Sequence, residues 1–358
     1  MKARTGRPTE PDGELALLAR IRSRVGAAGT KPGRARNLSL GIGDDCALVR
    51  IKRGEEIAIT TDLSIAGRHF ELAWHPPEAI GHRVLARGLS DLAAMGSRPV
   101  AAFLSLGIPK ELAKRSKSRD AKSMSPRQDA WIDRFYDGLL ALAAEFDTPL
   151  AGGDLAESPI AVADIVLVGA VPWGKALLRS GARPGDAVYV TGNLGGAAAG
   201  LEMLKGLAEA RKGSGVGGLR ISSQMYEDLA KHLYPQPRIM QGLWLAKRGL
   251  ATAAIDVSDG LSTDLQHLCD ESGVAAEVNA HALPISTGAS IQHALSGGED
   301  YELLFTARPN TRIPRKIAGV AVTQIGQIVR RSAKKPLITL VTHEGREALE
   351  VKGWEHFA

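Results

Sequence analysis

The sequence predicts a mixed α/β (α+β) fold divided into two domains. Its length supports two domains, because 358 residues exceed what one hydrophobic core usually holds. Its pattern supports a mixed fold, because short β-rich runs alternate with stretches whose apolar residues recur at helical spacing. A polar turn at residues 181–186 follows the longest apolar run and starts a new strand. We therefore place the boundary near Pro172, with domains of residues 1–172 and 173–358.

The helices and strands of the first domain follow from apolar spacing and turn residues. We expect helices over residues 14–25, from Pro77 to just before Gly96, and over residues 131–146. A capping box at residues 125–128 is expected to precede the third helix. Strands are expected over residues 47–51, 57–60, 100–106 and 160–171, the first two joined as a hairpin. Asp91 lies inside the apolar stretch of the second helix, where an aspartate needs a partner.

The second domain repeats this succession of strands, glycine turns and helices. A strand over residues 187–190 leads into a glycine loop at residues 192–196 and then a helix. The stretch 253–260 is predicted to be a strand that breaks into a turn and a further helix. A glycine turn at residues 297–300 precedes a strand over residues 301–306. Both domains therefore contribute acidic residues at turns.

The composition indicates a globular protein, with 44% hydrophobic and 23% charged residues. Aromatic residues make up 4% of the chain, which argues against single-strand nucleic-acid binding by stacking, despite a net charge of +6. Much of the positive charge lies in residues 1–7, 110–127 and 205–220, which we interpret as solvated loops or tails of no assigned function. The alternative is a nucleic-acid or membrane patch, but none of the three has interleaved aromatic residues or a clear amphipathic repeat.

The two cysteines, Cys46 and Cys269, are isolated and far apart in the sequence. A disulfide scaffold and a thiolate zinc site are therefore both disfavoured. The first residues lack an apolar core, and the longest apolar run, residues 160–173, is interrupted by Asp164. We therefore expect no signal peptide, no membrane span and a cytoplasmic location.

Acidic residues gather at predicted strand ends and glycine turns, although the net charge of the chain is positive. The stretch 41–46 carries Asp44 and Asp45 on a turn that its glycines allow to bend sharply, and an ordinary polar turn is the alternative there. Repetition along the chain favours a functional reading. The repeated set is Asp44, Asp45, Asp62, Asp91, Asp154, Asp256, Asp259, Glu299 and Asp300. Carboxylates that converge repel one another unless a cation lies between them, and ligation by oxygen alone predicts Mg²⁺ or Mn²⁺.

Magnesium held by carboxylates usually binds a polyphosphate, but the sequence has no standard nucleotide loop. The nearest match to GxxxxGK[ST], residues 169–176, has Ala176 in place of the metal-binding hydroxyl and Pro172 in place of an amide donor. The loop at residues 192–196 fits GxGxxG poorly. It has two readings, a tight strand-to-helix turn or a phosphate contact. The HRD and DFG motifs of protein kinases are absent from the sequence.

Eight motifs resemble those of the thiamine-monophosphate kinase family, in the same order and with similar spacing. They are GIGDDCALV, TTDLSIAGRHF, GLSDLAAMG, GGD, RSGARPGD, IDVSDGL, GGEDYELLFT and KGWEHF. The resemblance implies the two-domain fold of the aminoimidazole ribonucleotide synthetase superfamily. In that fold the strands of the amino-terminal domain build a dimer barrel, and an α/β carboxy-terminal domain completes the site. A homodimer is therefore expected. The superfamily binds ATP without a Walker loop, which explains the failed motif search.

The resemblance also assigns roles to individual residues. It implies a set that binds several Mg²⁺ ions: Asp45, Thr60, Thr61, Asp62, Asp91, Asp154, Asp256 and Asp259. It implies ATP contacts at Arg179 and Ser258, and through the backbone of Gly153. It implies substrate contacts at His69 and Glu299, with the ring of Trp354 beside the thiamine heterocycles. Structural alternatives are open for three of these: His69 as a core histidine, Arg179 as a surface charge and Trp354 as a terminal anchor.

The implied reaction transfers the γ-phosphoryl group of ATP to thiamine monophosphate, giving thiamine diphosphate and ADP. The acceptor phosphate is already an anion, so no dedicated general base is expected, and positioning with charge neutralisation should carry catalysis. Two positions depart from the family pattern. Ala66 replaces a common Glu and Gly88 replaces the usual Asn, which leaves the local loop geometry open. Neither position belongs to the implied metal set, so we expect activity to survive.

Two competing functions stay open at this point. One is another ATP-dependent enzyme of the same superfamily, such as a ribonucleotide synthetase or a selenophosphate synthetase. The selenophosphate synthetases resemble one another in a reactive Cys or selenocysteine ahead of the first acidic motif, and no cysteine precedes Cys46 here. The other is a non-catalytic metal- or nucleic-acid-binding protein, with acidic turns serving structure and basic stretches serving contact.

Overall fold

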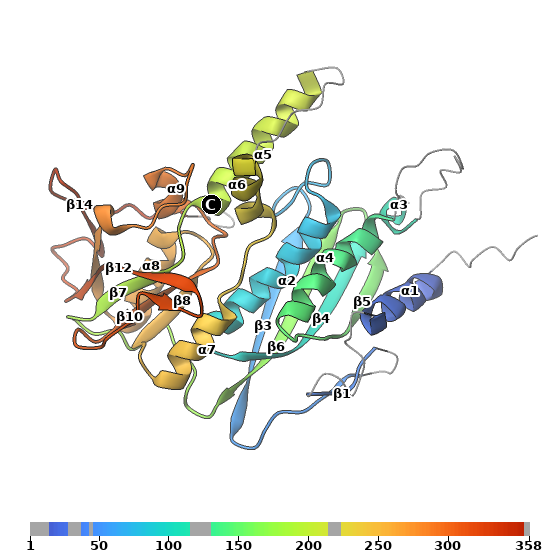
Figure 1. Ribbon diagram of the computed structural model, residues 1–358, viewed down its shortest axis with the longest axis horizontal. Helices are drawn as coiled ribbons and strands as arrows, with labels where there is room; N and C mark the ends of the chain where they lie inside the picture. The colour runs from blue at the N-terminus through green and yellow to red at the C-terminus, as the bar shows by residue number, and fades with distance from the viewer. Residues whose placement is uncertain (1–13, 28–36, 43–45, 115–129, 214–222, 354–358) are drawn as a thin grey trace, which may run out of the picture.

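Two β-sheets with helices packed against them make up the computed structural model, which describes residues 14–27, 37–42, 46–114, 130–213 and 223–353 (Figure 1). In the first half of the chain the elements are α1 (Glu14–Ala27), β1 (Leu38–Leu40), β2 (Leu48–Val49), β3 (Glu55–Ile65), α2 (Pro77–Ala94), β4 (Arg98–Ile108), α3 (Lys110–Ala113), α4 (Trp131–Glu145), β5 (Leu150–Glu157) and β6 (Val162–Pro172). In the second half they are β7 (Ala187–Thr191), α5 (Gly196–Gly213), α6 (Ser223–Leu233), α7 (Ile239–Arg248), β8 (Ala253–Val257), α8 (Leu261–Ser272), β9 (Ala275–Asn279), the 3₁₀ turn η1 (Ala280–Ala282), α9 (Ile291–Ser296), β10 (Glu302–Ala307), β11 (Lys316–Ile317), β12 (Val320–Val329), β13 (Ile338–Val341) and β14 (Arg346–Ala348).

The sheet of the first domain has four strands in the order β3-β6-β4-β5, with β4 and β5 parallel and the other pairs antiparallel. Helices α2 and α4 pack on one face of this sheet (Figure 1). Both helices carry the apolar repeat that the sequence predicts, and Leu85, Leu89, Phe135 and Leu139 are fully buried. Proline at the start of α2 and the turn at Gly96 (φ +62°) after its end explain why its length was predictable.

The opposite face of this sheet is largely open, and most of the β3 side chains on it are apolar. Side chains alternate along β3, so those at Thr60, Asp62 and Ser64 face the helices, and those at Ile57, Ile59, Thr61 and Leu63 face away. Ile57, Ile59 and Leu63 are 54%, 67% and 47% exposed. The β1–β2 hairpin packs on part of the same face, where Leu38 meets Val100, Ala101, Ala151 and Ala170. We call the remainder, centred on Ile57, Ile59 and Leu63, the open face.

The sheet of the second domain has the order β14-β13-β9-β12-β7-β10-β8, and β11 pairs with β12. Its pairs are antiparallel except for β13 with β9. Helix α8 packs against this sheet, where Leu261, Leu265 and Leu268 are buried together with Val190 and Ile255. Helices α5 and α6 pack on each other and project from the body as an arm, which we call the α5–α6 arm (Figure 1).

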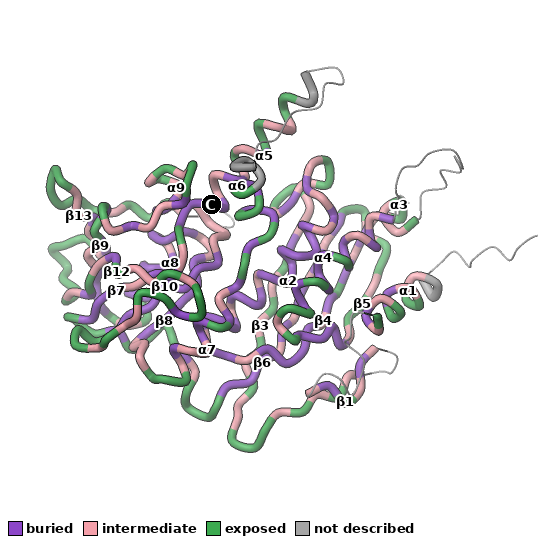
Figure 2. The backbone as a smooth tube through the Cα atoms, in the orientation of Figure 1, coloured by how far each residue is buried: buried purple, intermediate pink, exposed green. Residues whose placement is uncertain are grey.

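The two domains share a continuous hydrophobic core. Residues of α2 and β6 lie in one buried cluster with Leu177, Leu245 and Phe305 from the second half of the chain. Helix α2 is buried along most of its length (Figure 2). Helix α7 crosses α2 so closely that a Cβ on Gly242 would lie 2.0 Å from the carbonyl oxygen of Ala93. Close packing of this kind fixes how the two halves of a site at the junction face each other.

Four sequence predictions need correction. The hairpin of residues 47–51 with 57–60 is wrong, because β2 pairs with β1 and the eleven-residue β3 pairs with β6. Thr60, Thr61 and Asp62 therefore lie within a strand and not at its end. The turn predicted at Gly152 and Gly153 is part of β5. Residues 205–213 of the second basic stretch form the end of α5 and not a loop.

Other predictions fall at the limits of the described residues. The capping box at residues 125–128 lies outside them, and α4 begins at Trp131 with Ala130 as its N-cap. Most of the basic stretch 110–127 and residues 214–220 lie outside them as well. Within the described part of the chain, no helix combines the length and apolar character needed to cross a membrane.

Candidate active site

One face of α2 organises the candidate site. Arg83, Arg87, Ser90 and Asp91 are spaced by four, three and one residues, which places them on the same side of a helix. This side meets β3 of the first domain and the β8 and β10 region of the second. The helix therefore carries basic, hydroxyl and acidic groups to the junction of the two domains.

The residues of β3 that face α2 bind to it directly. Thr60 donates a hydrogen bond through its hydroxyl to Oδ2 of Asp91. Asp91 thus has the partner that its position inside an apolar helix demands, as predicted. Arg87 Nε donates to Oδ1 of Asp62 at 2.6 Å. Burial raises the pKa of Asp62 and Asp91 above the usual value for aspartate, because water is withdrawn from the charged form.

Asp256 brings a buried carboxylate to α2 from the other domain. It lies in β8, is 3% exposed, and accepts a hydrogen bond of 2.6 Å from the Ser90 hydroxyl. Burial, and then the charge of Asp91, raise the pKa of Asp256 to about 7. Neither Asp91 nor Asp256 forms an ion pair with a described residue, although the charge of Arg179 acts to lower the pKa of both. Two neighbouring carboxylates in this state form a site that a cation would stabilise.

The turn after β8 is shaped by Asp264 of α8, a residue that the sequence reasoning missed. Its Oδ2 accepts hydrogen bonds from the backbone amides of Ser258, Asp259 and Gly260 at 3.0, 3.1 and 3.1 Å. Gly260 has φ +114°, which favours glycine. The three amides therefore already donate to Asp264 and are not free to bind an anion. This turn is better suited to present oxygen atoms to a cation.

A second loop packs on this turn and carries Glu299. The backbone amide of Glu299 donates to the carbonyl oxygen of Ser258 at 2.7 Å. The Glu299 carboxylate accepts from Arg83 Nη2 at 2.6 and 2.7 Å and lies 3.5 Å from Arg87 Nη1. Arg83 Nη2 also donates to the carbonyl oxygen of His69 at 3.1 Å. The two residues to which the family resemblance gives substrate contacts, His69 and Glu299, are thus joined by one arginine.

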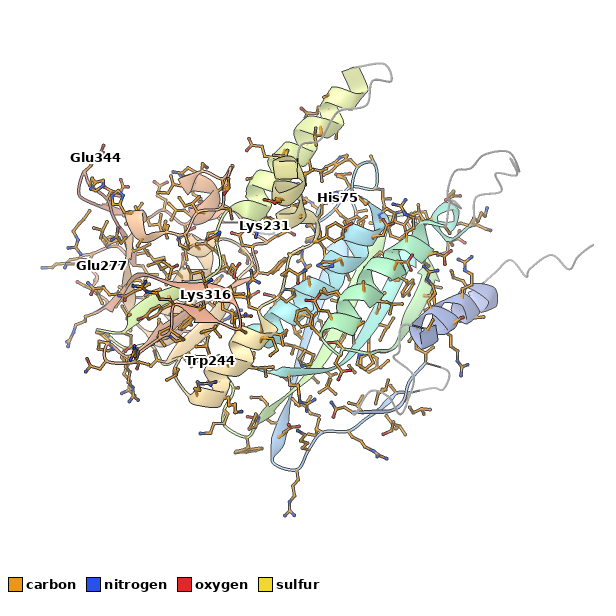
Figure 3. All side chains as sticks on the ribbon, viewed as in Figure 1. His75, Lys231, Trp244, Glu277, Lys316 and Glu344 are labelled. Carbon is orange, nitrogen blue, oxygen red and sulfur yellow. The ribbon has the colours of Figure 1, made fainter. Side chains whose placement is uncertain are left out.

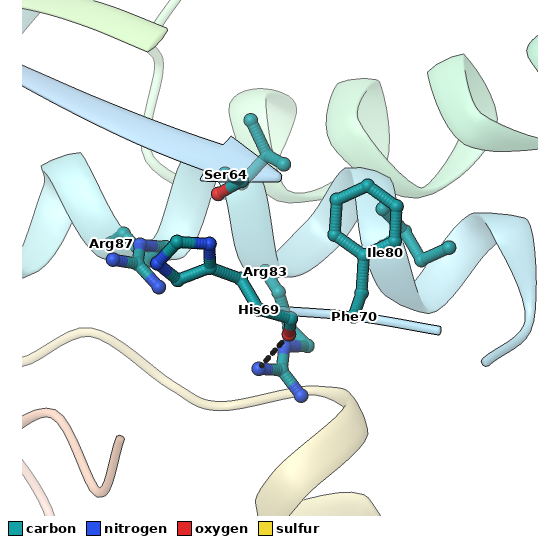
Figure 4. A pocket seen from close by; sticks show the side chains of 7 residues that line it. Ser64, His69, Phe70, Ile80, Arg83 and Arg87 are labelled. Atoms are coloured by element: carbon teal, nitrogen blue, oxygen red, sulfur yellow. Dashed lines mark hydrogen bonds between the residues drawn. The ribbon is translucent and has the colours of Figure 1, made fainter. Parts of the chain in front are cut away.

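A pocket opens beside this arginine. It is lined by Ser64, His69, Phe70, Ile80, Arg83, Val84 and Arg87 (Figure 4). The lining combines two guanidinium groups and an imidazole with apolar side chains. Such a lining suits a ligand that has both an anionic and an apolar part.

The neighbouring glycine loop at residues 192–196 is a tight turn. Asp300, one of the predicted acidic residues, accepts hydrogen bonds from the amides of Gly195 and Ala197 at 2.5 and 3.0 Å. Gly192 has φ +56°, and a Cβ there would lie 1.9 Å from Oε1 of Glu302. The carboxylate of Asp300 thus occupies amides that a phosphate would need, so the turn is the better of the two readings of this loop.

Two members of the implied metal set lie away from this cluster. The Thr61 side chain is on the open face, opposite to that of Asp62. Asp154 is exposed on β5, where its Oδ1 accepts from the amide of Leu155 at 2.8 Å. Strand β5 is three strands from β3, or about 14 Å at the usual strand spacing. Within one protomer the sheet therefore separates Asp154 from Asp62 and Asp91.

The remaining predicted residues divide between the site, the sheet and the segments outside the described residues. Asp259 and Ser258 lie on the turn that Asp264 shapes, and Arg179 acts electrostatically on Asp91 and Asp256. Gly153 has a structural reason to be glycine, because a Cβ there would lie 1.9 Å from the carbonyl oxygen of Leu104. Asp44, Asp45 and Trp354 lie outside the described residues.

Among the described residues, no three His, Cys, Asp or Glu side chains converge closely enough to hold an ion. The pair formed by the half-buried Asp91 and the buried Asp256 nevertheless fits a hard cation, because both carboxylates have raised pKa values and oxygen is the donor that Mg²⁺ prefers.

Comparison with protein families divides the chain into two matched regions. Residues 43–171 match the AIR synthase related protein, N-terminal domain, and residues 183–337 match the corresponding C-terminal domain. Among curated proteins, the chain is similar to the thiamine-monophosphate kinase of Salmonella typhimurium strain LT2. The two are 37% identical over 358 residues, covering 97% of this chain and 98% of the relative.

Solved structures with the same fold include two of particular interest. The thiamine-monophosphate kinase of Stenotrophomonas maltophilia K279a is 33% identical, with a TM-score of 0.72, covering 92% of this chain and 96% of that one. A structure described as AaThiL complexed with AMPPCP and TMP is 29% identical, with a TM-score of 0.69, covering 99% of this chain and all of that one. The fold is therefore the two-domain α/β fold of the AIR synthase related proteins.

Proposed function

This chain belongs to the thiamine-monophosphate kinase family of AIR synthase related proteins, and we propose that it phosphorylates thiamine monophosphate with ATP. The bond between the γ-phosphorus of ATP and the oxygen that bridges it to the β-phosphate breaks, and this oxygen leaves with ADP. An oxygen of the substrate phosphate forms a new bond to the γ-phosphorus. The products are thiamine diphosphate and ADP. The observation that carries the proposal is the pair of neighbouring carboxylates, the half-buried Asp91 and the buried Asp256, which come from the two domains.

Magnesium ions are part of this proposal. The residues that would hold them are Asp62, Asp91, Asp256 and Asp259, with Asp45 from the segment outside the described residues. When bound, Mg²⁺ supplies positive charge that offsets the negative charge of the phosphates. Arg87 neutralises Asp62 through their ion pair at 2.6 Å, so metal binding has to rearrange this contact.

The chain's own residues position the reactants and need not remove a proton. The acceptor phosphate is an anion near neutral pH, so its oxygen can attack without a general base. Arg179 and Ser258 contact the nucleotide in this proposal, and Arg179 has an exposed side chain suited to meeting a phosphate. His69 and Glu299 contact thiamine monophosphate beside the pocket that Arg83 and Arg87 line, with Trp354 beside the heterocycles.

A homodimer belongs to the same proposal. A second copy of the chain covers the open face, because Ile57, Ile59 and Leu63 form an apolar surface of the kind that protein interfaces bury. The strands of the two copies then build the dimer barrel. Thr61 and Asp154 lie on the same side of the sheet and would come to the interface.

The activity is tested with purified protein, ATP, Mg²⁺ and thiamine monophosphate, with thiamine diphosphate measured by fluorescence after oxidation to the thiochrome. We expect product that depends on all three components and disappears when EDTA removes the metal. The substrate of the ribonucleotide synthetases serves as the control acceptor and should give no product. If the folded protein makes no thiamine diphosphate under these conditions, the proposed function is wrong.

A further inference from the structure

Arg83 connects three segments that are far apart in the sequence. Its side chain is almost completely buried, with the residue 5% exposed. One guanidinium nitrogen, Nη2, donates to both carboxylate oxygens of Glu299 and to the carbonyl oxygen of His69. The other, Nη1, donates to the carbonyl oxygen of His232 at 3.3 Å and to Nε2 of its ring. One side chain of α2 therefore holds the segment after β3, the loop before β10 and the end of α6.

The ring of His232 is held in a defined state at the base of the α5–α6 arm. Burial, and then the nearby charge of Arg83, lower the pKa of His75 to about 3 and that of His232 well below its usual value. Both rings are therefore neutral near pH 7. Figure 3 places His75 beside α6, and the Nε2 atoms of the two rings are 3.0 Å apart.

The ring proton of His75 can be assigned from its partners. Nδ1 of His75 accepts from the amide of Glu71 at 3.0 Å, so its single proton lies on Nε2, which donates to His232. Nη1 of Arg83 lies within hydrogen-bonding distance of both ring nitrogens of His232, at 3.2 Å from Nδ1. Nδ1 of His232 is also 3.7 Å from Oε2 of Glu299. His75, His232, Arg83 and Glu299 are therefore linked by successive polar contacts.

Glu299 needs such support because its backbone is unusual. Its φ is +68°, in the left-handed region that a residue with a Cβ seldom adopts. Tyr301, two residues later, has φ +50°. Residues keep this conformation when the surrounding contacts determine it, and such positions concentrate at functional sites. The contacts that surround the Glu299 carboxylate come from Arg83, Arg87 and His232.

We propose that Arg83 is a positioning residue for the thiamine half of the substrate, fixing Glu299 and the His69 segment relative to each other. The inference rests on the proposed function, in which these two residues contact thiamine monophosphate. The groups on the metal side of the site are held by other partners: Asp91 by Thr60, Asp62 by Arg87 and Asp256 by Ser90. Loss of Arg83 should therefore weaken the binding of thiamine monophosphate and leave the binding of ATP nearly unchanged.

The competing reading is that Arg83 is a buried ion pair that only joins the two domains. A purely structural ion pair would change stability, or would change the kinetics of both substrates together. The experiment therefore has to separate the two substrates. It also needs a variant that keeps the positive charge, because removing one partner of a buried pair can unfold a protein.

The experiment compares Arg83→Ala and Arg83→Lys with the matched control Arg331→Ala, which removes an exposed ion pair with Asp270. We expect Arg83→Ala to raise KM for thiamine monophosphate about tenfold or more, with KM for ATP within about twofold of wild type. Arg83→Lys should give a smaller rise, because an ammonium keeps the charge but not the planar fork that reaches several acceptors. Millimolar guanidinium should partly restore Arg83→Ala, and Arg331→Ala should match wild type throughout.

Calorimetric binding of thiamine monophosphate without ATP gives a readout independent of turnover. The same weakening, about tenfold in Kd, is expected for Arg83→Ala. If Arg83→Ala folds and leaves KM and Kd for thiamine monophosphate unchanged, or raises both KM values equally, the inference is wrong. If Arg83→Ala does not fold, Arg83→Lys decides by the same criteria. A wild-type protein that neither binds nor phosphorylates thiamine monophosphate overturns the proposed function, and this inference with it.

Discussion

Among single residues, Asp256 has the most informative electrostatic environment. Its carboxylate is buried at the junction of the domains, accepts a hydrogen bond from Ser90 and feels the charge of Asp91. Without a cation, the folded protein therefore favours the protonated form. A buried carboxylate that binds metal is expected to have a raised pKa when the metal is absent, because the bound ion supplies the positive charge that the protein does not.

The raised pKa of Asp256 predicts that stability depends on pH in the absence of metal. Burial raises the pKa of Asp256 to about 7 in the folded protein, from the ordinary value of 3.8. Between about pH 4 and pH 7 the folded state therefore binds a proton that the unfolded state has lost, so stability falls as pH rises through this window. In EDTA, wild type should lose stability relative to Asp256→Asn across this range, and the difference should level off above it.

Chemical unfolding at several pH values measures this difference directly. Asp270→Asn is a matched control, because Asp270 is exposed and paired with Arg331 away from the site. Its unfolding free energy should run parallel to that of wild type. A constant difference between wild type and Asp256→Asn from pH 4 to pH 8 would show that Asp256 has an ordinary pKa and would contradict this description.

The two faces of strand β3 have different surroundings. The face towards α2 carries Thr60 and Asp62, which bind Asp91 and Arg87. The other face carries Ile57, Ile59 and Leu63, which are exposed in a single copy of the chain. The period of two along a strand allows one segment to serve both the site and the proposed dimer.

The open face predicts how the oligomer should respond to a charge. Ile59→Lys places an ammonium where the proposed interface is apolar, and burial of an unpaired charge is costly, so the variant should be monomeric. Light scattering coupled to gel filtration measures the mass. Met240→Lys is the control, because Met240 is also exposed, at 57%, but lies on α7. A wild-type monomer at micromolar concentration, or a dimer of Ile59→Lys, would exclude this interface.

Local signals predicted some elements well and others badly. Helices α2 and α4 have long apolar repeats, and proline and glycine mark the limits of α2, so their position was predictable. Strands β3 and β5 were misread because pairing at long range decides them. The glycines of β5 indicate a turn in the sequence, whereas the structure needs Gly153 where β4 approaches closely. The partner of β3 is β6, more than one hundred residues later.

The site residues likewise divide into those with a local sequence signal and those that depend on distant partners. Asp62, Asp91, Asp256 and Glu299 could be named from the sequence because acidic residues in turns and in apolar helices are conspicuous there. Arg83, Ser90 and His232 could not, because their roles depend on partners from distant elements. Asp264 had one weak local signal, an aspartate in the first turn of a helix that follows a glycine turn.

The site takes its form from the whole molecule. Helix α2 belongs to the first domain in sequence, but it packs against α7 and β8 of the second within one core. The carboxylates from the two domains are therefore brought together by a rigid element with buried contacts on both sides. In the proposed magnesium-dependent phosphoryl transfer, Asp91 and Asp256 act as one unit.

The most direct test is the rate of thiamine diphosphate formation by wild type, Asp91→Asn, Asp256→Asn and the double variant, each checked for folding. Each single substitution should lower kcat/KM by about a thousandfold or more, as expected for groups that act on the transferred phosphoryl. The kcat/KM of the double variant should be no lower than that of the less active single variant, because the effects of residues that act as one unit are not additive. Near-normal activity of either single variant, or losses that multiply in the double variant, would contradict a shared site.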